Sequence, residues 1–120
     1  MVNNKPNLTE YLEAGLRASS LQGKAIANNI ANINTPGYRR HEVDFSDVLK
    51  DAINDGKPVD LTRLEDAIYQ PKDTPVDGNG NDVTLEAEIG EMIKNSGRYK
   101  TYMRMLGTYY RQMERAMRTE

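Results

Sequence analysis

Oxygen-bearing side chains between residues 77 and 88 have the spacing of a calcium-binding loop. Positions one, three, five and twelve of that pattern are filled by Asp77, Asn79, Asn81 and Glu88. The sixth position needs glycine for a sharp turn, but here it is Asp82. This departure argues against calcium, and we interpret the tract as a turn that leads into the N-terminus of a helix.

Other ligand and nucleophile chemistry is thinly supplied. His41 is the one histidine and there is no cysteine, so neither a multi-histidine nor a thiolate metal site can form within one chain. Because Arg39 and Arg40 precede it, His41 is expected to be a solvated loop residue. We find no nucleophile–base pair, phosphate-binding loop or recognisable carboxylate pair. The sequence therefore predicts a protein that is not an enzyme and that needs no metal or cofactor.

Arginines recur every seven residues toward the C-terminus, at Arg104, Arg111 and Arg118, with Tyr102 and Tyr109 nearby. A basic stripe with aromatic neighbours is typical of a nucleic-acid contact. The whole chain is acidic, however, with a formal net charge of −2 and a pI near 5.5. We therefore predict no nucleic-acid partner and expect the stripe to pair with acidic side chains.

The composition is lean in large apolar side chains for a self-contained globule of 120 residues. Hydrophobic residues make up 38%, the mean hydropathy is −0.76, and there is one Phe and no Trp. Such a chain either stays partly disordered or completes its burial against other chains. No apolar run approaches the roughly 20 residues of a membrane span, and the N-terminus lacks the apolar segment of a secretory signal.

An amphipathic helix is predicted near the N-terminus, where Asn7 and Glu10 have the spacing of a capping box. Its apolar and small residues alternate at spacings of four and three, the pattern of a coiled-coil seam. That seam consists of Leu12, Leu16, Ser19, Gly23, Ile26, Ile30 and Ile33. The helix is expected to stop before Pro36, which lacks an N–H, and Gly37 supplies the freedom for a tight turn.

A second, longer helix is predicted to follow Thr84 as its N-cap. Its seam keeps the same alternation through Leu85, Ile89, Met92, Ser96, Tyr99, Met103, Leu106, Tyr110, Met113 and Met117. This run exceeds four heptads, a length that is typical of a coiled coil. A helix from Leu85 to Arg118 would be about 50 Å long, which a lone domain of this size cannot cover.

The two helices are expected to pair as an antiparallel coiled coil, so the predicted fold class is mainly α. In this pair, Ile26, Ile30 and Ile33 are predicted to pack against the segment Tyr99–Met113. Residues 1–36 and 84–120 would form one discontinuous domain. Residues 37–83 would form an extended, irregular linker with a short helix near residues 45–53.

Charge favours the antiparallel direction. The acidic start of the first helix, Glu10 and Glu13, would lie beside the basic end of the second, at Arg111, Arg115 and Arg118. Conversely, Lys24 would lie toward Glu86, Glu88 and Glu91. Exposed ion pairs are each worth roughly 0–1 kcal/mol, so they bear on orientation more than on stability.

Asparagines crowd the end of the first helix, at Asn28, Asn29, Asn32 and Asn34. Asparagine is a poor helix former whose amide prefers to bond elsewhere. This cluster therefore indicates amide bonds to a neighbouring chain or to a loop.

The same stretch carries a resemblance to a known family. Residues Ala27 to Tyr38 read Ala-Asn-Asn-Ile-Ala-Asn-Ile-Asn-Thr-Pro-Gly-Tyr, which closely resembles the N-terminal signature of the bacterial flagellar rod, hook and hook-associated proteins. Ser19-Ser20-Leu21-Gln22 before it and Asp44-Phe45 after it extend the match. Within the family, the exit from the signature, the entry into the second helix and the shortness of the chain are most similar to the proximal rod proteins.

The resemblance implies a fold and a structural function. In such proteins the terminal helices pair into an inner, D0-like coiled-coil domain that stacks helically into a tube. The chain would be a subunit of the basal-body rod, the drive shaft that transmits torque from the membrane ring to the hook. The turn motif of Asn28, Asn29, Asn32, Asn34, Thr35, Pro36, Gly37 and Tyr38 would contact neighbouring subunits.

The resemblance also implies partners and a location. The partners would be copies of the chain, other rod proteins, the membrane-ring and export-gate junction proteins, and the flagellar type III export apparatus. Export by that apparatus would place the chain in the periplasmic rod without a cleaved signal peptide. Two alternatives stay open: another rod protein of the same family, and a stand-alone helical-hairpin adaptor that binds an acidic partner through the arginine stripe.

Overall fold

The computed structural model describes residues 8–44, 46 and 67–118. Its elements in chain order are helix α1 (Leu8–Ala31), strand β1 (Glu42–Val43), strand β2 (Ile68–Tyr69) and helix α3 (Leu85–Arg118). The expectation of a mainly helical chain with an irregular middle is confirmed, with a small sheet added to that middle. The short helix predicted near residues 45–53 falls outside the described residues, except for Ser46.

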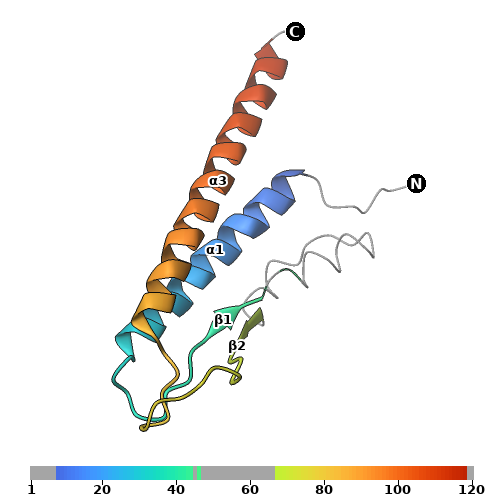
Figure 1. The fold of residues 1–120 in the computed structure, drawn as a ribbon. Coiled ribbons are helices and arrows are strands. Elements are labelled where there is room, and N and C mark those ends of the chain that lie inside the picture. The colour runs from blue at the N-terminus through green and yellow to red at the C-terminus, as the bar shows by residue number, and fades with distance from the viewer. Residues whose placement is uncertain (1–7, 45, 47–66, 119–120) are drawn as a thin grey trace, which may run out of the picture.

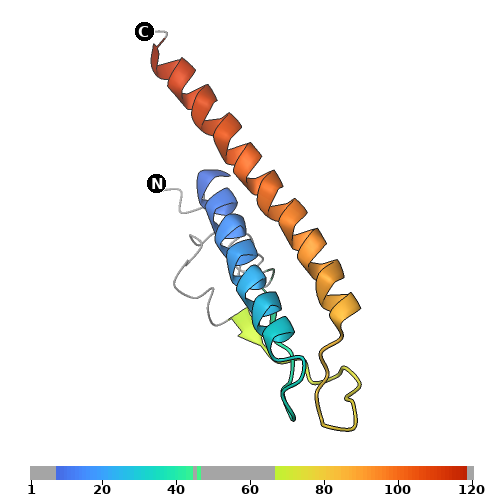
Figure 2. The same ribbon diagram turned by 90° about the vertical axis from the view of Figure 1, so that its left-hand side faces the viewer.

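The two long helices form an antiparallel hairpin (Figures 1 and 2). We call the end where α1 finishes and α3 begins the base, and the opposite end the tip. Near the base, Asn29 contacts Glu88; toward the tip, the Glu13 carboxylate accepts a hydrogen bond of 3.0 Å from the Tyr110 hydroxyl. Helix α3 continues past the start of α1 at the tip (Figure 1).

This register corrects the predicted packing partners. The Asn95 amide donates to the Ser19 carbonyl at 2.8 Å, so the middle of α1 lies against residue 95. Residues near Ile26 consequently face the first turns of α3, and the segment Tyr99–Met113 lies beside the first half of α1. The antiparallel direction was right, but the pairing of Ile26, Ile30 and Ile33 with Tyr99–Met113 was wrong.

The helix ends follow local sequence chemistry. Helix α1 stops at Ala31, and the Thr35 N–H bonds back to the Asn32 carbonyl at 3.0 Å in the turn that precedes Pro36. Ile33 therefore lies just beyond the helix, half-buried in this turn. Helix α3 has the predicted bounds, and Glu86 and Glu88 lie in its first turn, where the helix dipole favours negative charge.

The face that α3 turns toward α1 is polar rather than apolar. The buried residues of α3 are Glu88, Asn95 and Leu106. Of its predicted seam, Leu106 is thus the one buried member and Ser96 is exposed. The exposed apolar members range in exposure from 39% to 72%: Leu85, Ile89, Met92, Tyr99, Met103, Tyr110, Met113 and Met117. On α1, Leu12, Ser19 and Ile26 are buried as expected, and Leu16 and Ile30 are half-buried.

A notch in α1, formed by the absence of a side chain at Gly15, lets this polar face of α3 pack closely against α1. A Cβ atom built at Gly15 would lie 2.4 Å from two ring atoms of Tyr102, so the tyrosine ring occupies the space that a side chain would fill. Tyr102 follows Asn95 by seven residues, as Asn95 follows Glu88, so all three lie on one side of α3. The helices thus meet where one offers hydrogen-bonding groups and the other offers small residues.

Replacing Gly15 by leucine should destabilise the hairpin by about 1–3 kcal/mol, because Tyr102 must leave its notch. The change is measured as the shift in urea midpoint followed by far-UV circular dichroism. Gly97→Leu is the matched control, since a Cβ there meets no atom within 4 Å, and leucine is the better helix former. In a Tyr102→Ala background, Gly15→Leu should lose its effect; an equal loss there would contradict the notch.

Strands β1 and β2 form a two-stranded antiparallel sheet beside α1 (Figure 1). Glu42 pairs with Tyr69 and Val43 with Ile68. The Val43 N–H donates to the buried Gln22 side chain of α1 at 2.9 Å. The sheet is therefore attached to the helix through a polar contact, and it carries Glu42 toward the base.

Candidate functional site

Two loops run side by side at the base of the hairpin, one after α1 and one before α3 (Figures 1 and 2). The Gly37 N–H donates to the Asn79 carbonyl at 2.8 Å. Gly37 and Gly80 both have positive φ angles, of 74° and 81°, which glycine adopts without steric cost. A Cβ at Gly80 would lie 3.5 Å from the Gly37 Cα, so the two backbones are in close contact.

Asn81 joins the second loop to the end of α1. Its amide nitrogen donates to the carbonyls of Asn32 and Thr35 at 2.8 and 2.9 Å. Its amide oxygen accepts from the Val83 N–H at 2.8 Å. Both carbonyls also accept a backbone N–H within the turn, from Thr35 and Tyr38 at 3.0 and 3.2 Å, so Asn81 adds a second donor to each from a distant part of the chain.

Asn29 is the centre of the base and is completely buried, with 0% of its surface exposed. Its amide nitrogen donates to the His41 carbonyl at 2.9 Å and to a Glu88 carboxylate oxygen at 3.1 Å. Its amide oxygen accepts from the His41 N–H at 2.9 Å and from the Tyr38 hydroxyl at 3.1 Å. One side chain of α1 thereby connects the loop after α1 to the first turn of α3.

Arg40 neutralises the Glu88 carboxylate, of which Asn29 contacts one oxygen and Arg40 the other. Its Nε donates to the fully buried Glu88 at 3.0 Å, and its Nη1 contacts Glu42. Burial alone would lower the pKa of Arg40, but the hydrogen bonds to Glu42 and Glu88 outweigh it and raise the pKa. Burial would likewise raise the pKa of Glu42, but the hydrogen bonds from Arg40 and Tyr69 lower it. The guanidinium therefore stays charged between two carboxylates.

A second ion pair lies beside the first. The Arg39 Nε donates to the buried Asp82 carboxylate at 3.1 Å, and the other Asp82 oxygen accepts from the Arg40 N–H at 2.6 Å. Asp82 thus holds both the side chain and the backbone of the arginine dipeptide. Consecutive arginines that follow the turn are each matched by a carboxylate from the entry to α3.

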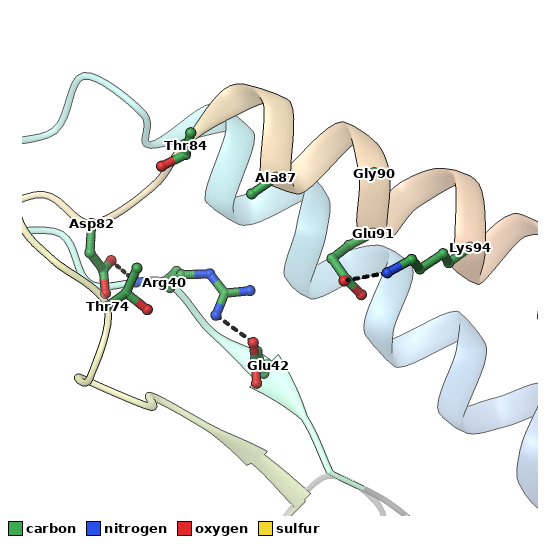
Figure 3. A pocket seen from close by; sticks show the side chains of 9 residues that line it. All are labelled: Arg40, Glu42, Thr74, Asp82, Thr84, Ala87, Gly90, Glu91 and Lys94. Carbon is green, nitrogen blue, oxygen red and sulfur yellow. Dashed lines mark hydrogen bonds and ion pairs between the residues drawn. The ribbon is translucent and has the colours of Figure 1, made fainter.

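A polar cavity of about 400 Å³ opens between these ion pairs and α3 (Figure 3). Its walls are formed by Arg40, Glu42, Thr74, Asp82, Thr84, Ala87, Gly90, Glu91 and Lys94. Arg40 and Glu42 point toward one another across the loop side, and Lys94 reaches Glu91 along α3 at 3.7 Å. Most of the charged side chains that line the cavity are thus engaged in ion pairs, and these pairs stabilise the base.

The Tyr69 hydroxyl reports on this charge arrangement. It donates to Glu42 at 2.8 Å, and this bond is the main reason that its pKa is raised to about 12. Glu42→Gln should lower the pKa of Tyr69 toward 10, followed by the ring carbon chemical shifts in an NMR titration. Glu86→Gln is the control and should leave Tyr69 protonated at about pH 11. An unchanged Tyr69 titration in Glu42→Gln would contradict the bond.

The predicted turn motif divides into buried and exposed parts. Asn29 bonds to a loop of its own chain, where we expected a neighbouring subunit, and its side chain is inaccessible to such a contact. Tyr38 and Asn32 are half-buried. The rest of the motif is exposed at the base: Asn28, Asn34, Thr35, Pro36 and Gly37.

Sequence reasoning missed Arg39, Arg40, Asn81 and Asp82 as members of the base. The partners that they reach across the base are 35 or more residues away in the chain, so no local spacing connects them. A usable signal was the two adjacent arginines directly after the turn together with Asn81, Asp82 and Glu88 before and within α3. At the tip, where Glu10 and Glu13 were expected beside Arg111, Arg115 and Arg118, Glu13 binds Tyr110, and Arg118 binds Glu114 of its own helix at 2.6 Å.

Comparison with known proteins identifies the class to which this fold and base belong. Residues 12–39 match the family described as flagella basal body rod protein. The chain is 33% identical over 110 residues to the flagellar basal body rod protein FlgB of Bacillus subtilis (strain 168), covering 83% of this chain and 85% of that protein. The chain therefore belongs to the family of flagellar basal body rod proteins.

Within this family the similarity is to the FlgB proteins. The chain is 25% identical to FlgB of Aeromonas hydrophila, with 88% of each chain covered. It is 26% identical to FlgB of Proteus mirabilis (strain HI4320), with 94% of this chain and 95% of that one covered. The relatives thus match both helices and the base, well beyond the signature at Ala27–Tyr38.

The chain is accordingly a structural protein of the flagellar basal-body rod, a class that assembles with other rod components. In the part of the chain that the structure describes, no helix is both long and apolar enough to cross a membrane. The resemblance noted in the sequence and the expected structural role are both confirmed.

Proposed function

We infer that this chain is a subunit of the proximal segment of the rod, where it packs against copies of itself and other rod proteins in the shaft that carries torque to the hook. The observation that supports this inference is the large apolar face that α3 leaves exposed. We call this face the α3 flank and define it as Leu85, Ile89, Met92, Tyr99, Met103, Tyr110 and Met113, each 39–49% exposed.

The α3 flank is too extensive to be explained by chance exposure. Single exposed apolar residues are common, but contiguous apolar patches on monomers mark interaction sites. Together with Ser96 and the buried Leu106, which lie between them, its seven members follow spacings of four and three, so they lie on one side of the helix along its length. Since the polar side of α3 already faces α1, the flank is available to a neighbouring helix, and covering it would stabilise an assembly.

The rigid base supports the mechanical role. Torque passes through a shaft only if its subunits hold their shape, and the base joins α1, both loops and α3 through buried hydrogen bonds and ion pairs. Residues 1–36 with 84–120 would form the inner domain, with 37–83 as the linker. The exposed turn residues Asn34, Thr35 and Pro36 would contact the adjoining subunit.

The route to the rod follows from the same features. A chain whose α3 flank is covered only after assembly is less stable as a monomer than in the rod, which suits export in an unfolded state. We therefore assign the flagellar type III export apparatus as its carrier and the periplasmic rod as its destination. The membrane-ring and export-gate junction proteins would be its neighbours at the proximal end.

Met92→Asp tests the α3 flank. A carboxylate at this position should prevent the chain from entering purified basal bodies and abolish swimming, because it cannot be desolvated against a neighbouring apolar face. Thr101→Asp is the matched control, since residue 101 lies two and a half helical turns from residue 92 and thus on the opposite side of α3. Incorporation of Met92→Asp at the level of the Thr101→Asp control would overturn the assignment of the flank.

A further inference from the structure

The turn that precedes α3 contains the dipeptide Asn79–Gly80, which is the one Asn-Gly pair in the chain. Asparagine followed by glycine is the sequence in which a backbone nitrogen most readily attacks the preceding side-chain amide, because glycine has no Cβ to shield that nitrogen. Asn79 is exposed at the surface of the base, and Gly80 is half-buried. The pair therefore has the chemistry of a spontaneous deamidation site.

The reaction is a cyclisation followed by hydrolysis. The Gly80 nitrogen loses its proton to solvent and bonds to Cγ of Asn79, and the Cγ–Nδ2 bond breaks and releases ammonia. Water then opens the five-membered imide at either of its two carbonyls. One product is an ordinary aspartyl residue, and the other is an isoaspartyl residue, in which the main chain runs through Cβ. No atom is oxidised or reduced, and water is the only co-reactant.

The folded base holds the peptide group between Asn79 and Gly80 on both sides. Its carbonyl oxygen accepts from the Gly37 N–H at 2.8 Å, and its N–H donates to the Asp77 carbonyl at 2.9 Å. The side-chain oxygen of Asn79 is engaged as well, since it accepts from the Asn81 N–H at 3.2 Å. The nitrogen has to give up its proton and turn toward Cγ, so these bonds must open before the reaction can begin.

The isoaspartyl product does not fit the closed base. It adds one carbon atom to the main chain inside a turn that the Asp77 N–H closes by donating to the Asn81 carbonyl at 2.8 Å. The backbones of Gly37 and Gly80 are already in contact there, because a Cβ at Gly80 would lie 3.5 Å from the Gly37 Cα. The new carboxylate also falls between Asp77 and Asp82 in the sequence, so like charges are brought together.

We propose that Asn79–Gly80 is a deamidation site that the closed base protects and that reacts in chains whose base is open. Chains that carry the isoaspartyl product then cannot close the base again, which limits how long an unassembled chain stays competent to fold. This chemistry goes beyond the inferred structural role and does not depend on it. Its consequence for assembly rests on the inferred export in an unfolded state.

The first test compares folded and unfolded protein. The full-length chain is incubated at one mildly alkaline pH with and without denaturing urea, and peptide mass spectrometry follows the mass gain of an amide-to-acid change at residue 79. The reaction should be about tenfold or more faster in urea, because the base is then open in every molecule. Equal rates would overturn protection by the base, and an unmodified residue 79 in urea would overturn the site. Asn79→Gln is the control and should stay unmodified, since its longer side chain closes a ring less readily.

The second test opens the base without changing the turn. Asn29→Ala removes the buried amide that joins the loop after α1 to α3, so deamidation in native buffer should be about tenfold or more faster than in the wild type. Asn28→Ala, at an exposed position of the same helical turn, should react at the wild-type rate. An Asn29→Ala variant that fails to fold should react at the rate measured in urea. Equal rates in Asn29→Ala and Asn28→Ala would contradict protection by the base.

The third test examines the consequence of the reaction. Isoaspartyl chains, separated after incubation in urea and returned to native buffer, should lack hydrogen-exchange protection at the Gly37 N–H. Asn79→Asp introduces the charge on an ordinary main chain and should retain this protection. Isoaspartyl chains that regain it would overturn the proposed limit on folding. Incorporation of freshly prepared wild-type chain into basal bodies tests the rod assignment separately, so failure of one inference is distinguishable from failure of the other.

Discussion

Asn29→Ala is expected to destabilise the protein by about 3 kcal/mol or more, the largest loss we anticipate from deleting one uncharged side chain. The substitution removes four hydrogen bonds at a fully buried position. It leaves the His41 N–H and carbonyl without their partner, and it removes a donor from Glu88. Each buried polar group left unsatisfied costs about 1–3 kcal/mol, so the sum exceeds the loss of one average hydrogen bond.

The neighbouring residue provides a matched control. Asn28 has the same side chain and lies in the same helical turn, but it is exposed. Asn28→Ala should leave stability unchanged or raise it slightly, because alanine is the better helix former. Chemical denaturation followed by circular dichroism gives both values. Equal effects of the two substitutions would show that the buried amide does not hold the base together.

Asn29→Ala should also loosen the loop after α1 while both helices stay formed. Without its bonds to His41 and Glu88, the described part of the loop after α1 keeps the arginine pairs, the Asn81 bonds and the Gly37–Asn79 hydrogen bond as its links to α3 and the loop before it. Amide hydrogen exchange should therefore speed up at His41 and Gly37 while the middle of α3 keeps its protection. Uniform loss of protection along both helices would instead indicate that the base and the hairpin unfold as one unit.

Arg40→Met is expected to cost about 3–5 kcal/mol at neutral pH. Removing one partner of a buried ion pair leaves an uncompensated charge, which is far more costly than removing both partners. Here the remaining charge is Glu88, whose carboxylate is fully buried and would keep only the Asn29 amide. Methionine retains much of the arginine stem, so the loss reports on the charge rather than on packing.

The sign of the pH dependence distinguishes this mechanism from a packing defect. In the wild type, burial would raise the pKa of Glu42, but the hydrogen bonds from Arg40 and Tyr69 lower it. Glu42 therefore contributes stability that is present above its unfolded pKa and is lost as the pH falls through the lowered folded pKa. Arg40→Met lacks the part of this contribution that Arg40 supplies, so the stability gap between variant and wild type should narrow as the pH falls below about 4.5.

Lys94→Met is the control for this experiment. Lys94 borders the same cavity, but its side chain is 67% exposed and its contact with Glu91 is 3.7 Å long. Exposed pairs are worth about 0–1 kcal/mol, so this variant should unfold near the wild-type midpoint at every pH. A pH-independent loss in Arg40→Met would assign its effect to lost packing and would contradict the role of the ion pairs that Arg40 makes.

The polar base and the apolar flank have complementary consequences for a rod subunit. Buried hydrogen bonds have strict geometry, so the base permits one register of α1 on α3. The flank has less directional chemistry and can adapt to a neighbouring helix. A subunit built in this way defines its own hairpin internally and obtains much of its apolar burial from the assembly.

The sequence alone determined the two long helices and their antiparallel direction. The bounds of α3 follow from Thr84 as N-cap, acidic residues in the first turn and an uninterrupted four-three alternation. The end of α1 follows from Pro36 and Gly37, whose backbone restrictions act on their nearest neighbours. These signals are local, and local sequence is enough to express them. The signature at Ala27–Tyr38 identified the family for the same reason.

Only the tertiary structure decided which side of each helix is internal. The apolar alternation of α3 predicted that its apolar side faces α1, but the side that faces α1 carries Glu88, Asn95 and Tyr102. Each of these has a partner on α1: Asn29 bonds to Glu88, the Ser19 carbonyl accepts from Asn95, and the space at Gly15 holds the Tyr102 ring. Hydrophobicity measures the tendency to leave water and does not say whether the covering surface belongs to the same chain or to another. The partners of Arg39, Arg40 and Asn81 are distant in sequence, so their bonds exist only once the loops at the base have been brought together.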